Sequence, residues 1–257
     1  MEIVSVGWGI QSSCLYFMSS LGIIPRADHA IFADTGAEHP KTLEYLDYAI
    51  EWMKENNGIP IHVVSDRNIL DDIRKSVSGS RVASIPVFTG NEGKLRRQCT
   101  GEYKIDQVKK KIREIYGLKK GQNMKPTEMW IGISTDEATR MKDSELHNIE
   151  NKYPLIDEMM SRGDCIKWLA ANGFEVPIKS SCVFCPFHSN SAWVEIKNNE
   201  PESWETAKEV DNIIRKPTGN IREERFLHRS LKPIDESYLG EDQTNLFENE
   251  CEGYCGI

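Results

Sequence analysis

The 257-residue sequence lacks any apolar run long enough to span a lipid bilayer. It also lacks the basic segment followed by an apolar stretch that marks a secretory signal, and it contains no internal repeat or low-complexity tract. These absences argue against a secreted, membrane-spanning or repeat protein, and we expect a cytoplasmic location. The formal net charge of −8 argues against indiscriminate binding to nucleic acid, although it leaves room for a local basic face.

The composition that remains is that of an ordinary globular protein, with 39% hydrophobic and 28% charged residues. A chain of this size can form one large core or a domain with a smaller subdomain. Seven cysteines, four of them in two short pairs, indicate a reducing compartment and metal or thiol chemistry. Disulfide bonds are the alternative interpretation of the same residues.

Short apolar segments alternate with segments of helical periodicity through the first two thirds of the chain. We expect strands at residues 1–6, 28–34, 59–64 and 129–133, and helices at 14–21, 41–56, 69–77, 102–116 and 155–172, the last as one or two helices. This alternation predicts an α/β fold with a parallel sheet, whose strand ends face a ligand at one edge.

Two stretches interrupt this pattern. Residues 78–94 are rich in Gly and Ser, and we expect a loop or flap there, with a disordered connector as the alternative. After Gly173 the sequence becomes polar and rich in Trp and Cys, with little strand signal. We therefore expect one domain over residues 1–165 and a smaller, mostly helical or irregular, cysteine-rich part over residues 166–257.

A glycine-containing loop, Ser5-Val6-Gly7-Trp8-Gly9-Ile10-Gln11-Ser12-Ser13, separates the first expected strand from the first expected helix. Glycines let a backbone approach a ligand closely, and the start of a helix favours an anion. Ser12 and Ser13 could cap that helix or donate hydroxyl groups to a phosphate. The loop is neither a Walker A loop nor a dinucleotide fingerprint. It predicts a phosphate site, with a plain strand-to-helix turn as the alternative.

This loop resembles a variant of the PP-loop of the N-type ATP pyrophosphatases and the phosphoadenosine phosphosulfate (PAPS) reductases. The usual PP-loop is Ser-Gly-Gly-x-Asp-Ser, and Gln11 stands where that pattern has Asp. Residues 32–36, 97–105 and 132–140 and the terminal cysteines extend the resemblance over most of the chain, and it is closest to the PAPS-reductase-like branch. The resemblance implies a Rossmann-like, adenine nucleotide alpha hydrolase-like domain that binds ATP and Mg²⁺.

The segment Asp34-Thr35-Gly36 follows the second expected strand. The resemblance implies that its backbone reads an adenine edge while Asp34 orders the loop. The alternative is a turn in which Asp34 bonds only its own backbone. Glu38 and His39 are the next polar residues, and we expect His39 to lie on the surface.

A second loop, residues 132–140, follows another expected strand and ends in Arg140. A guanidinium at this position can pair with two phosphate oxygens, and the resemblance implies a loop that closes over nucleotide phosphates or sulfate. Asp136 and Glu137 precede it. They could hold Mg²⁺ or cap the N-terminus of a helix.

The densest positive stretch consists of Arg96, Arg97, Lys104, Lys109, Lys110, Lys111 and Arg113. A solvated helix face explains such a run as well as a site for a phosphate-rich substrate, including an RNA or DNA backbone. Cys99 lies at the head of the same expected helix, where N–H groups lower the pKa of a thiol. With Arg97 and Lys104 included, the candidate nucleotide-binding residues are Ser5, Gly7, Gly9, Gln11, Ser12, Ser13, Asp34, Thr35, Gly36, Arg97 and Lys104.

The most specific chemical signal is Cys182-Val183-Phe184-Cys185-Pro186-Phe187-His188, because a C-x-x-C turn directs two thiolates at one centre. Proline after the second cysteine is typical of iron–sulfur loops, so we expect a 4Fe–4S cluster first. Zinc with His188, a redox dithiol and ordinary thiols remain alternatives. The expected cluster ligands are Cys99, Cys182, Cys185 and Cys251, with Cys255 as the alternative fourth ligand.

Two further cysteines, Cys251 and Cys255, lie in a C-terminal segment that resembles the Glu-Cys-Gly end of PAPS reductases, where the cysteine attacks sulfur. One of them could complete the cluster while the other carries sulfur, so both are catalytic candidates together with Arg140. Cys14 and Cys165 lie in apolar helical surroundings, and we expect them to pack in the core.

The resemblance implies a PP-loop ATP pyrophosphatase that adenylates an acceptor, for sulfur transfer to a nucleic acid or nucleotide. Thiol-dependent reduction of an adenylyl sulfate, as in PAPS reductases, is the first alternative. A non-catalytic nucleotide-binding subunit of a modification complex is the second. The partners expected are an adenine nucleotide, a tRNA or DNA substrate, and a cysteine desulfurase or other sulfur donor, and a homodimer is compatible with the sequence.

Overall fold

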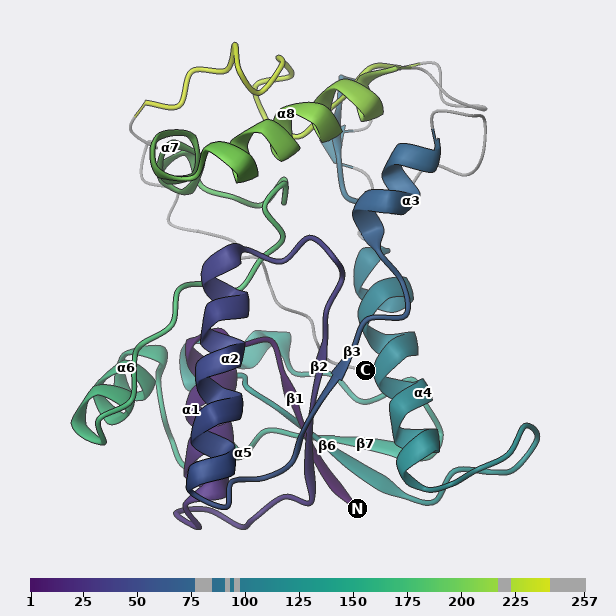
Figure 1. Cartoon of the computed structure of the whole chain (residues 1–257), viewed down its shortest axis with the longest axis vertical. Coiled ribbons are helices and arrows are strands. Elements are labelled where there is room, and N and C mark those ends of the chain that lie inside the picture. The colour runs from purple at the N-terminus through teal and green to yellow at the C-terminus, as the bar shows by residue number, and fades with distance from the viewer. Residues whose placement is uncertain (77–84, 91–92, 95–97, 217–222, 241–257) are drawn as a thin grey trace.

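The computed structural model describes residues 1–76, 85–90, 93–94, 98–216 and 223–240 (Figure 1). Its strands are β1 (Glu2–Val6), β2 (His29–Ala33), β3 (Ile61–Val64), β4 (Phe88–Thr89), β5 (Gly93–Lys94), β6 (Thr127–Ile131), β7 (Ile149–Lys152) and β8 (Arg225–Phe226). Its helices are α1 (Ile10–Ser20), α2 (Pro40–Glu55), α3 (Ile69–Ser76), η1 (Gly101–Ile105), α4 (Asp106–Ile115), η2 (Thr135–Arg140), α5 (Pro154–Asp157), α6 (Arg162–Ala171), α7 (Asn190–Asn199) and α8 (Pro201–Arg215).

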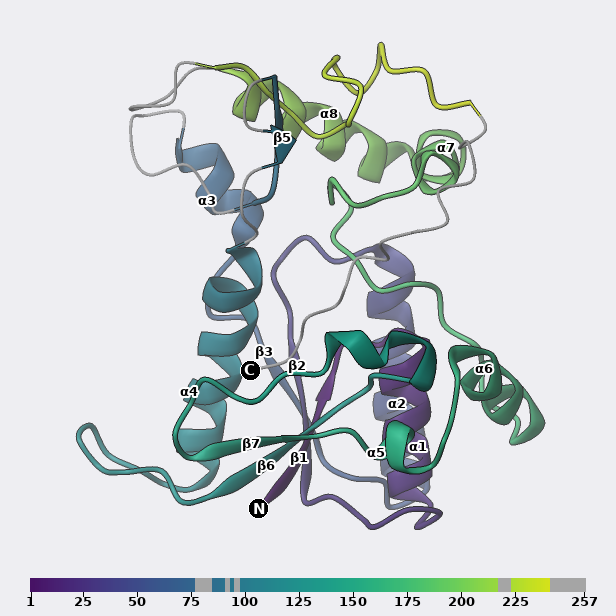
Figure 2. The same cartoon turned by 180° about the vertical axis from the view of Figure 1, so that it is seen from behind.

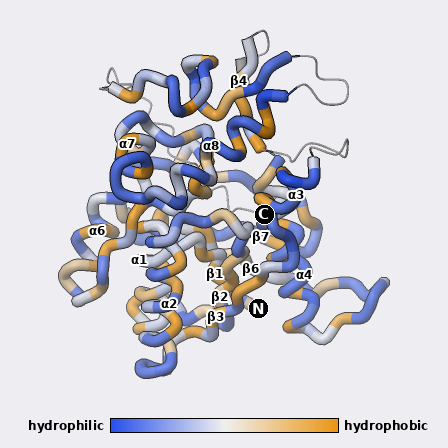
Figure 3. Tube along the Cα trace, turned by 45° about the horizontal axis from the view of Figure 1, so that its top comes forward, coloured by the Kyte–Doolittle hydropathy of each residue, from blue (hydrophilic) through white to orange (hydrophobic). Residues whose placement is uncertain are grey.

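The larger sheet has five strands in the order β3-β2-β1-β6-β7, and every neighbouring pair is parallel. Parallel strands are usually covered on both faces, and alternate side chains explain how. Val4 and Phe32 pack in one core with α1, α2 and α6, whereas Ile3 and Ile31 pack in another with α4. Figure 3 shows the hydrophobic colour concentrated along these central strands. The α/β class with a Rossmann-like parallel sheet is thereby confirmed.

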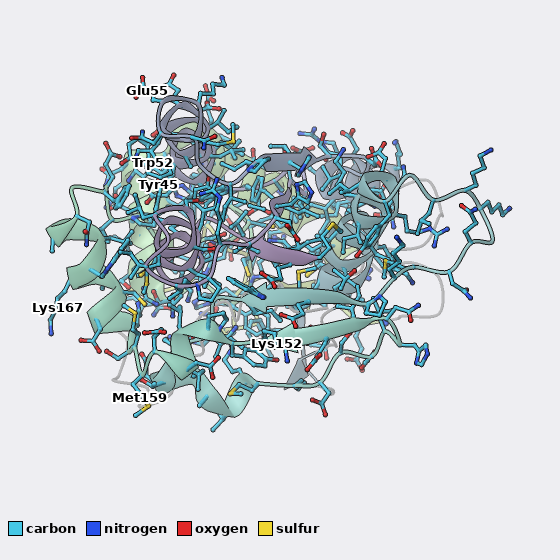
Figure 4. The ribbon with its side chains drawn as sticks, turned by 90° about the horizontal axis from the view of Figure 1, so that it is seen from below. Tyr45, Trp52, Glu55, Lys152, Met159 and Lys167 are labelled. Atoms are coloured by element: carbon cyan, nitrogen blue, oxygen red, sulfur yellow. The ribbon has the colours of Figure 1, made fainter. Side chains whose placement is uncertain are left out.

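Aromatic side chains fill the space between α1 and α2. The ring of Phe17 lies 4.9 Å from the ring of Trp52 and 4.0 Å from that of Phe174, measured between centroids. The ring of Tyr45 lies 6.2 Å from the fully buried ring of Trp8, which belongs to the glycine loop. Figure 4 shows Tyr45 and Trp52 on α2 on the side that faces α1. The helix that follows the glycine loop is therefore fixed by close packing.

A second core lies beyond the carboxyl ends of the parallel strands (Figures 1 and 2). It joins the antiparallel sheet β5-β4-β8 to α3, α7 and α8, with Trp193 and Trp204 among its buried side chains. Asp211 of α8 is fully buried, and its carboxylate accepts the backbone N–H groups of Leu227 and Ile234. Two distant parts of the sequence, from α3 to η1 and from the C-x-x-C segment onward, build this core together.

Several elements differ from the expectation. Helix α1 begins at Ile10, four residues earlier than expected, and β7 forms in a polar stretch where no strand was expected. Helices α7 and α8 occupy a region that we expected to be irregular as much as helical. Part of the expected 78–94 loop forms β4 and β5. The 155–172 segment forms two helices, α5 and α6, and the domain boundary after residue 165 stays a prediction.

Among the residues that the structure describes, no helix is both long enough and apolar enough to cross a membrane.

Candidate nucleotide and thiol site

Three loops meet at the carboxyl ends of β1, β2 and β6, which are neighbours in the sheet. The packing there is close enough to require glycine at residue 132, where a Cβ atom would lie only 2.7 Å from the backbone nitrogen of Ser12. On the other side, a Cβ atom at Gly9 would lie 3.5 Å from Ser180, just before the C-x-x-C segment. The sheet edge is the place where a ligand binds in such folds.

The glycine loop leads directly into α1. Gly9 is the N-cap residue, and no side chain caps the helix, so of the two alternatives for Ser12 and Ser13 the structure does not show the capping one. Because α1 begins within the loop, both serines lie in its first turn. The Ser12 hydroxyl accepts the Gly7 N–H at 3.3 Å and donates to the Gly9 carbonyl at 3.2 Å, so it braces the loop. An uncapped helix start with its dipole favours an anion.

The loop after β6 contacts the glycine loop through side chains. The amide nitrogen of Gln11 donates to Glu137 Oε2 at 3.1 Å, and Glu137 Oε1 pairs with Arg140 at 2.6 Å. Asp136 instead accepts the backbone N–H of Arg162 at 2.9 Å, at the start of α6. Glu137 thus faces the glycine loop, whereas its neighbour Asp136 caps the start of α6.

The turn after β2 is ordered by its own aspartate. Asp34 accepts the Gly36 N–H at 2.8 Å, and Gly36 has φ +76°, a conformation that glycine adopts without strain. This is the self-bonded turn that the sequence left open as one alternative. It fixes the path of the backbone at the sheet edge.

Glu38 is the most deeply buried acid of the edge, because its side chain is 0% exposed. Its Oε1 accepts a hydrogen bond from the Thr35 hydroxyl at 3.0 Å and lies 3.2 Å from Lys104 Nζ. Its Oε2 is buried without a hydrogen-bond partner among the described residues. The Thr35 hydroxyl also lies 3.4 Å from Cys182 Sγ, so this acid, its lysine and the thiol form one group.

His39 is buried rather than on the surface, so that expectation was wrong. Its Nδ1 accepts the Lys41 N–H at 3.2 Å and caps α2, and its Nε2 pairs with Glu200 at 2.8 Å. Burial lowers the pKa of His39, and the charge of Glu200 works against that shift. His39 thereby connects the sheet domain to the junction of α7 and α8.

The C-x-x-C segment runs antiparallel to the turn after β2. Val183 N–H donates to the Ala37 carbonyl at 2.9 Å, and Glu38 and Cys182 form an isolated β-bridge. Cys185 N–H donates to the Cys182 carbonyl at 3.0 Å and closes the turn. His188 Nε2 donates to the same carbonyl at 2.9 Å, and burial lowers the pKa of His188 to about 4. That nitrogen supports the turn and does not point a lone pair at a metal.

The thiols suit a soft metal in their chemistry. Burial raises the pKa of Cys182 well above its usual value, and the nearby charges of Glu38 and Cys99 add to that effect. A bound cation would reverse this shift. Within the described part of the chain, no three His, Cys, Asp or Glu side chains are arranged to hold a metal ion. The expected residues Cys251, Cys255 and Arg97 lie outside the described residues. Cys14 and Cys165 are fully buried, which confirms their packing in the core.

Glu38 and His39 are the residues of this edge that sequence reasoning undervalued. One signal for His39 was present, because Pro40 follows it and proline is favoured at the first position of a helix. A residue before such a proline is a candidate N-cap and is therefore held in place. No comparable local signal marks Glu38, since Lys104 and Cys182 lie far away in the sequence.

The sequence matches no protein-family model, and no curated protein is significantly similar to it. Two examples of the solved structures that are similar to this one are a PAPS reductase and a tRNA thiolase. One is PAPS reductase from Candida auris, with 12% identity and a TM-score of 0.43, covering 68% of this chain and 74% of that one. The other is the U34-tRNA thiolase NcsA from Methanococcus maripaludis with its 4Fe–4S cluster, with 13% identity and a TM-score of 0.43, covering 84% and 73%. PAPS reductases are among the proteins that the loop motifs resemble.

Proposed function

We propose that the chain is a PP-loop enzyme that binds ATP with Mg²⁺ along the carboxyl edge of its parallel sheet and adenylates an oxygen of an acceptor. The observation that carries this proposal is the meeting of two unlike groups at one edge. The uncapped start of α1 and Arg140 offer donors to phosphate, and Ser180, just before the C-x-x-C segment, packs against Gly9. Phosphoryl transfer depends on such positioning and charge neutralisation.

In the proposed reaction, the acceptor oxygen attacks the α-phosphorus of ATP, and the bond to the bridging oxygen breaks. Pyrophosphate leaves, and Arg140 and the first turn of α1 neutralise its charge; Mg²⁺ bound with the nucleotide would supply further positive charge. AMP is then attached to the acceptor oxygen and makes it a good leaving group. A sulfur nucleophile attacks the acceptor carbon, the carbon–oxygen bond breaks, and AMP departs.

The sulfur would come to the acceptor from the thiol side of the edge. Cys182, Cys185 and Cys99 would hold an iron–sulfur cluster or zinc, with Cys251 or Cys255 as a further ligand. A bound cluster would supply a site that holds sulfur for transfer. The acceptor would be a nucleic acid, such as tRNA or DNA, or a nucleotide, and a cysteine desulfurase or another donor would supply the sulfur.

The test is pyrophosphate release by anaerobically purified protein supplied with ATP, Mg²⁺ and candidate acceptors, tRNA and DNA first. Release that depends on an acceptor is the expected result. ATP binding without release from any acceptor would instead support a non-catalytic nucleotide-binding subunit. Release of sulfite from an adenylyl sulfate, abolished by Cys255→Ser, would replace this proposal with a reductase.

A further inference from the structure

The glycine loop has no acidic side chain of its own, and the first turn of α1 has none either. Position 11 carries Gln where the loop pattern that it resembles has Asp. A carboxylate nevertheless reaches the loop from the segment that follows β6, the strand beside β1. Glu137, 126 residues away in sequence, accepts a hydrogen bond from the Gln11 amide at 3.1 Å.

The same carboxylate holds the arginine of the site. Glu137 Oε1 lies 2.6 Å from an Arg140 nitrogen, and both side chains are only 13% and 14% exposed. Arg140 Nε is buried and has no hydrogen-bond partner among the described residues, so the guanidinium keeps donor capacity beyond its pair with Glu137. At this low exposure, a misplaced charge costs more than it would in water.

We propose that Glu137 is the carboxylate of the phosphate loop, delivered by the second loop in place of an acid at position 11. Gln11 and Glu137 are positioning residues, and they hold Arg140 for the polyphosphate of the nucleotide. The inference rests on the proposed function for the identity of that ligand. This arrangement explains why residue 11 is neutral, because a carboxylate at position 11 would be repelled by the nearby carboxylate of Glu137.

If Glu137 has this role, aspartate at position 11, as in the usual PP-loop, should weaken nucleotide binding by this chain. Gln11→Asp removes the amide donor and places a negative charge opposite Glu137 and beside the phosphates. Changing Glu137 to Gln at the same time removes the repulsion between the two carboxylates, although Asp is one methylene shorter than Gln and does not rebuild the hydrogen bond itself. The effect of Q11D must therefore depend on residue 137, which is what a double-mutant cycle measures.

The experiment is calorimetric titration of Mg²⁺ and a non-hydrolysable ATP analogue into wild type, Q11D, E137Q and the double variant. Thermal unfolding of the four ligand-free proteins is recorded in parallel. We expect Q11D to weaken binding at least tenfold in the wild-type background and less than threefold in the E137Q background. Equal or tighter binding by Q11D, or the same loss in both backgrounds, would overturn the proposal.

The ligand-free measurements separate this proposal from the proposed function. If wild type binds no analogue, the proposed function fails, and the unfolding midpoints still test the contact. A midpoint that Q11D lowers in wild type and not in E137Q supports the contact, whereas equal shifts overturn it. If Q11D fails to fold while the double variant folds, the contact is supported. If neither folds, Q11M in the two backgrounds takes its place, with a threefold loss confined to the wild-type background as the supporting result.

Discussion

The two halves of the sheet edge differ in what they leave available. On the β1–β6 side, the first turn of α1 has no capping side chain, and Arg140 and Glu137 are partly accessible. On the β2 side, Glu38 is fully enclosed between Thr35 and Lys104. One half offers donors to an anion, whereas the other encloses a carboxylate beside thiols. Under the proposed function, this difference would keep the phosphate chemistry and the sulfur chemistry apart along a single edge.

The β2 side is the enclosed half of the edge, and the β1–β6 side is the open half. The enclosed half depends on buried charges more than the open half does. A buried charge is costly unless it is paired, whereas exposed pairs contribute little. Substitutions in the two halves should therefore have different consequences. Changes on the β2 side should alter metal content and stability, and changes on the β1–β6 side should alter nucleotide binding.

Replacing a thiol of the C-x-x-C turn should have the largest effect. In anaerobically purified protein, we expect Cys182→Ser and Cys185→Ser to lose most of the bound iron or zinc, because a soft metal needs both thiolates. Elemental analysis and a visible spectrum measure this. Cys165→Ser, a change in the sheet core, is the matched control and should keep the metal. Wild-type metal content in C182S would mean that the C-x-x-C turn does not hold the metal, and the β2 side would lose its proposed role.

Removing the counter-ion of Glu38 should have the next largest effect. Lys104→Met leaves a fully buried carboxylate without its charge partner, which should cost about 3 kcal/mol of unfolding free energy. Lys110→Met breaks an exposed pair with Asp66 and should lower stability far less than Lys104→Met does. Urea titrations of the two variants measure the difference. Equal losses of unfolding free energy would mean that the Glu38–Lys104 pair contributes no more than an exposed pair does.

The open half is tested by Arg140→Ala. We expect it to weaken binding of an ATP analogue about tenfold, or ~1.4 kcal/mol, because a charged pair with phosphate is lost. Stability should change less than in K104M. Arg74→Ala, which breaks an exposed pair with Glu209 between α3 and α8, is the control and should bind the analogue as wild type does. Unchanged binding by R140A would place the phosphates elsewhere.

The smallest effect concerns pH. Burial lowers the pKa of His39, so the unfolded chain takes up a proton at a higher pH than the folded protein does. The unfolding free energy should therefore be highest above about pH 6.5 and decrease as the pH falls below that value. His39→Asn keeps a capping acceptor and should reduce the loss between pH 7.5 and 5.5 by less than about 1 kcal/mol. Urea titrations at both pH values measure it, with exposed His147→Asn as control; an unchanged loss in H39N would contradict the assignment.

The sequence predicted the parts of the fold that local patterns determine. Strands β1, β2, β3 and β6 are apolar and alternate with amphipathic helices, which is enough to specify a parallel sheet. Strand β7 was missed because its Glu150, Asn151 and Lys152 are polar at the edge of the sheet. The second core was missed because it joins segments about a hundred residues apart, and periodicity within one segment carries no such information.

The candidate site divides in the same way. The glycine loop and the C-x-x-C turn are contiguous in sequence, so both were recognised as chemical signals. The pairings of Glu38 with Lys104 and of Gln11 with Glu137 join elements that are far apart in the sequence, and they form only once the sheet brings its strand ends together. The motif predicted Gln11 only as a candidate nucleotide-binding residue, and the positioning role proposed for it depends on that contact.

The most direct test of a polyphosphate site at the open half is a crystal structure with Mg²⁺ and a non-hydrolysable ATP analogue. The triphosphate is expected on the first turn of α1, within hydrogen-bond distance of Arg140, with the adenine beside residues 34–36. A nucleotide bound elsewhere, or a glycine loop left empty at saturating analogue, would contradict the account.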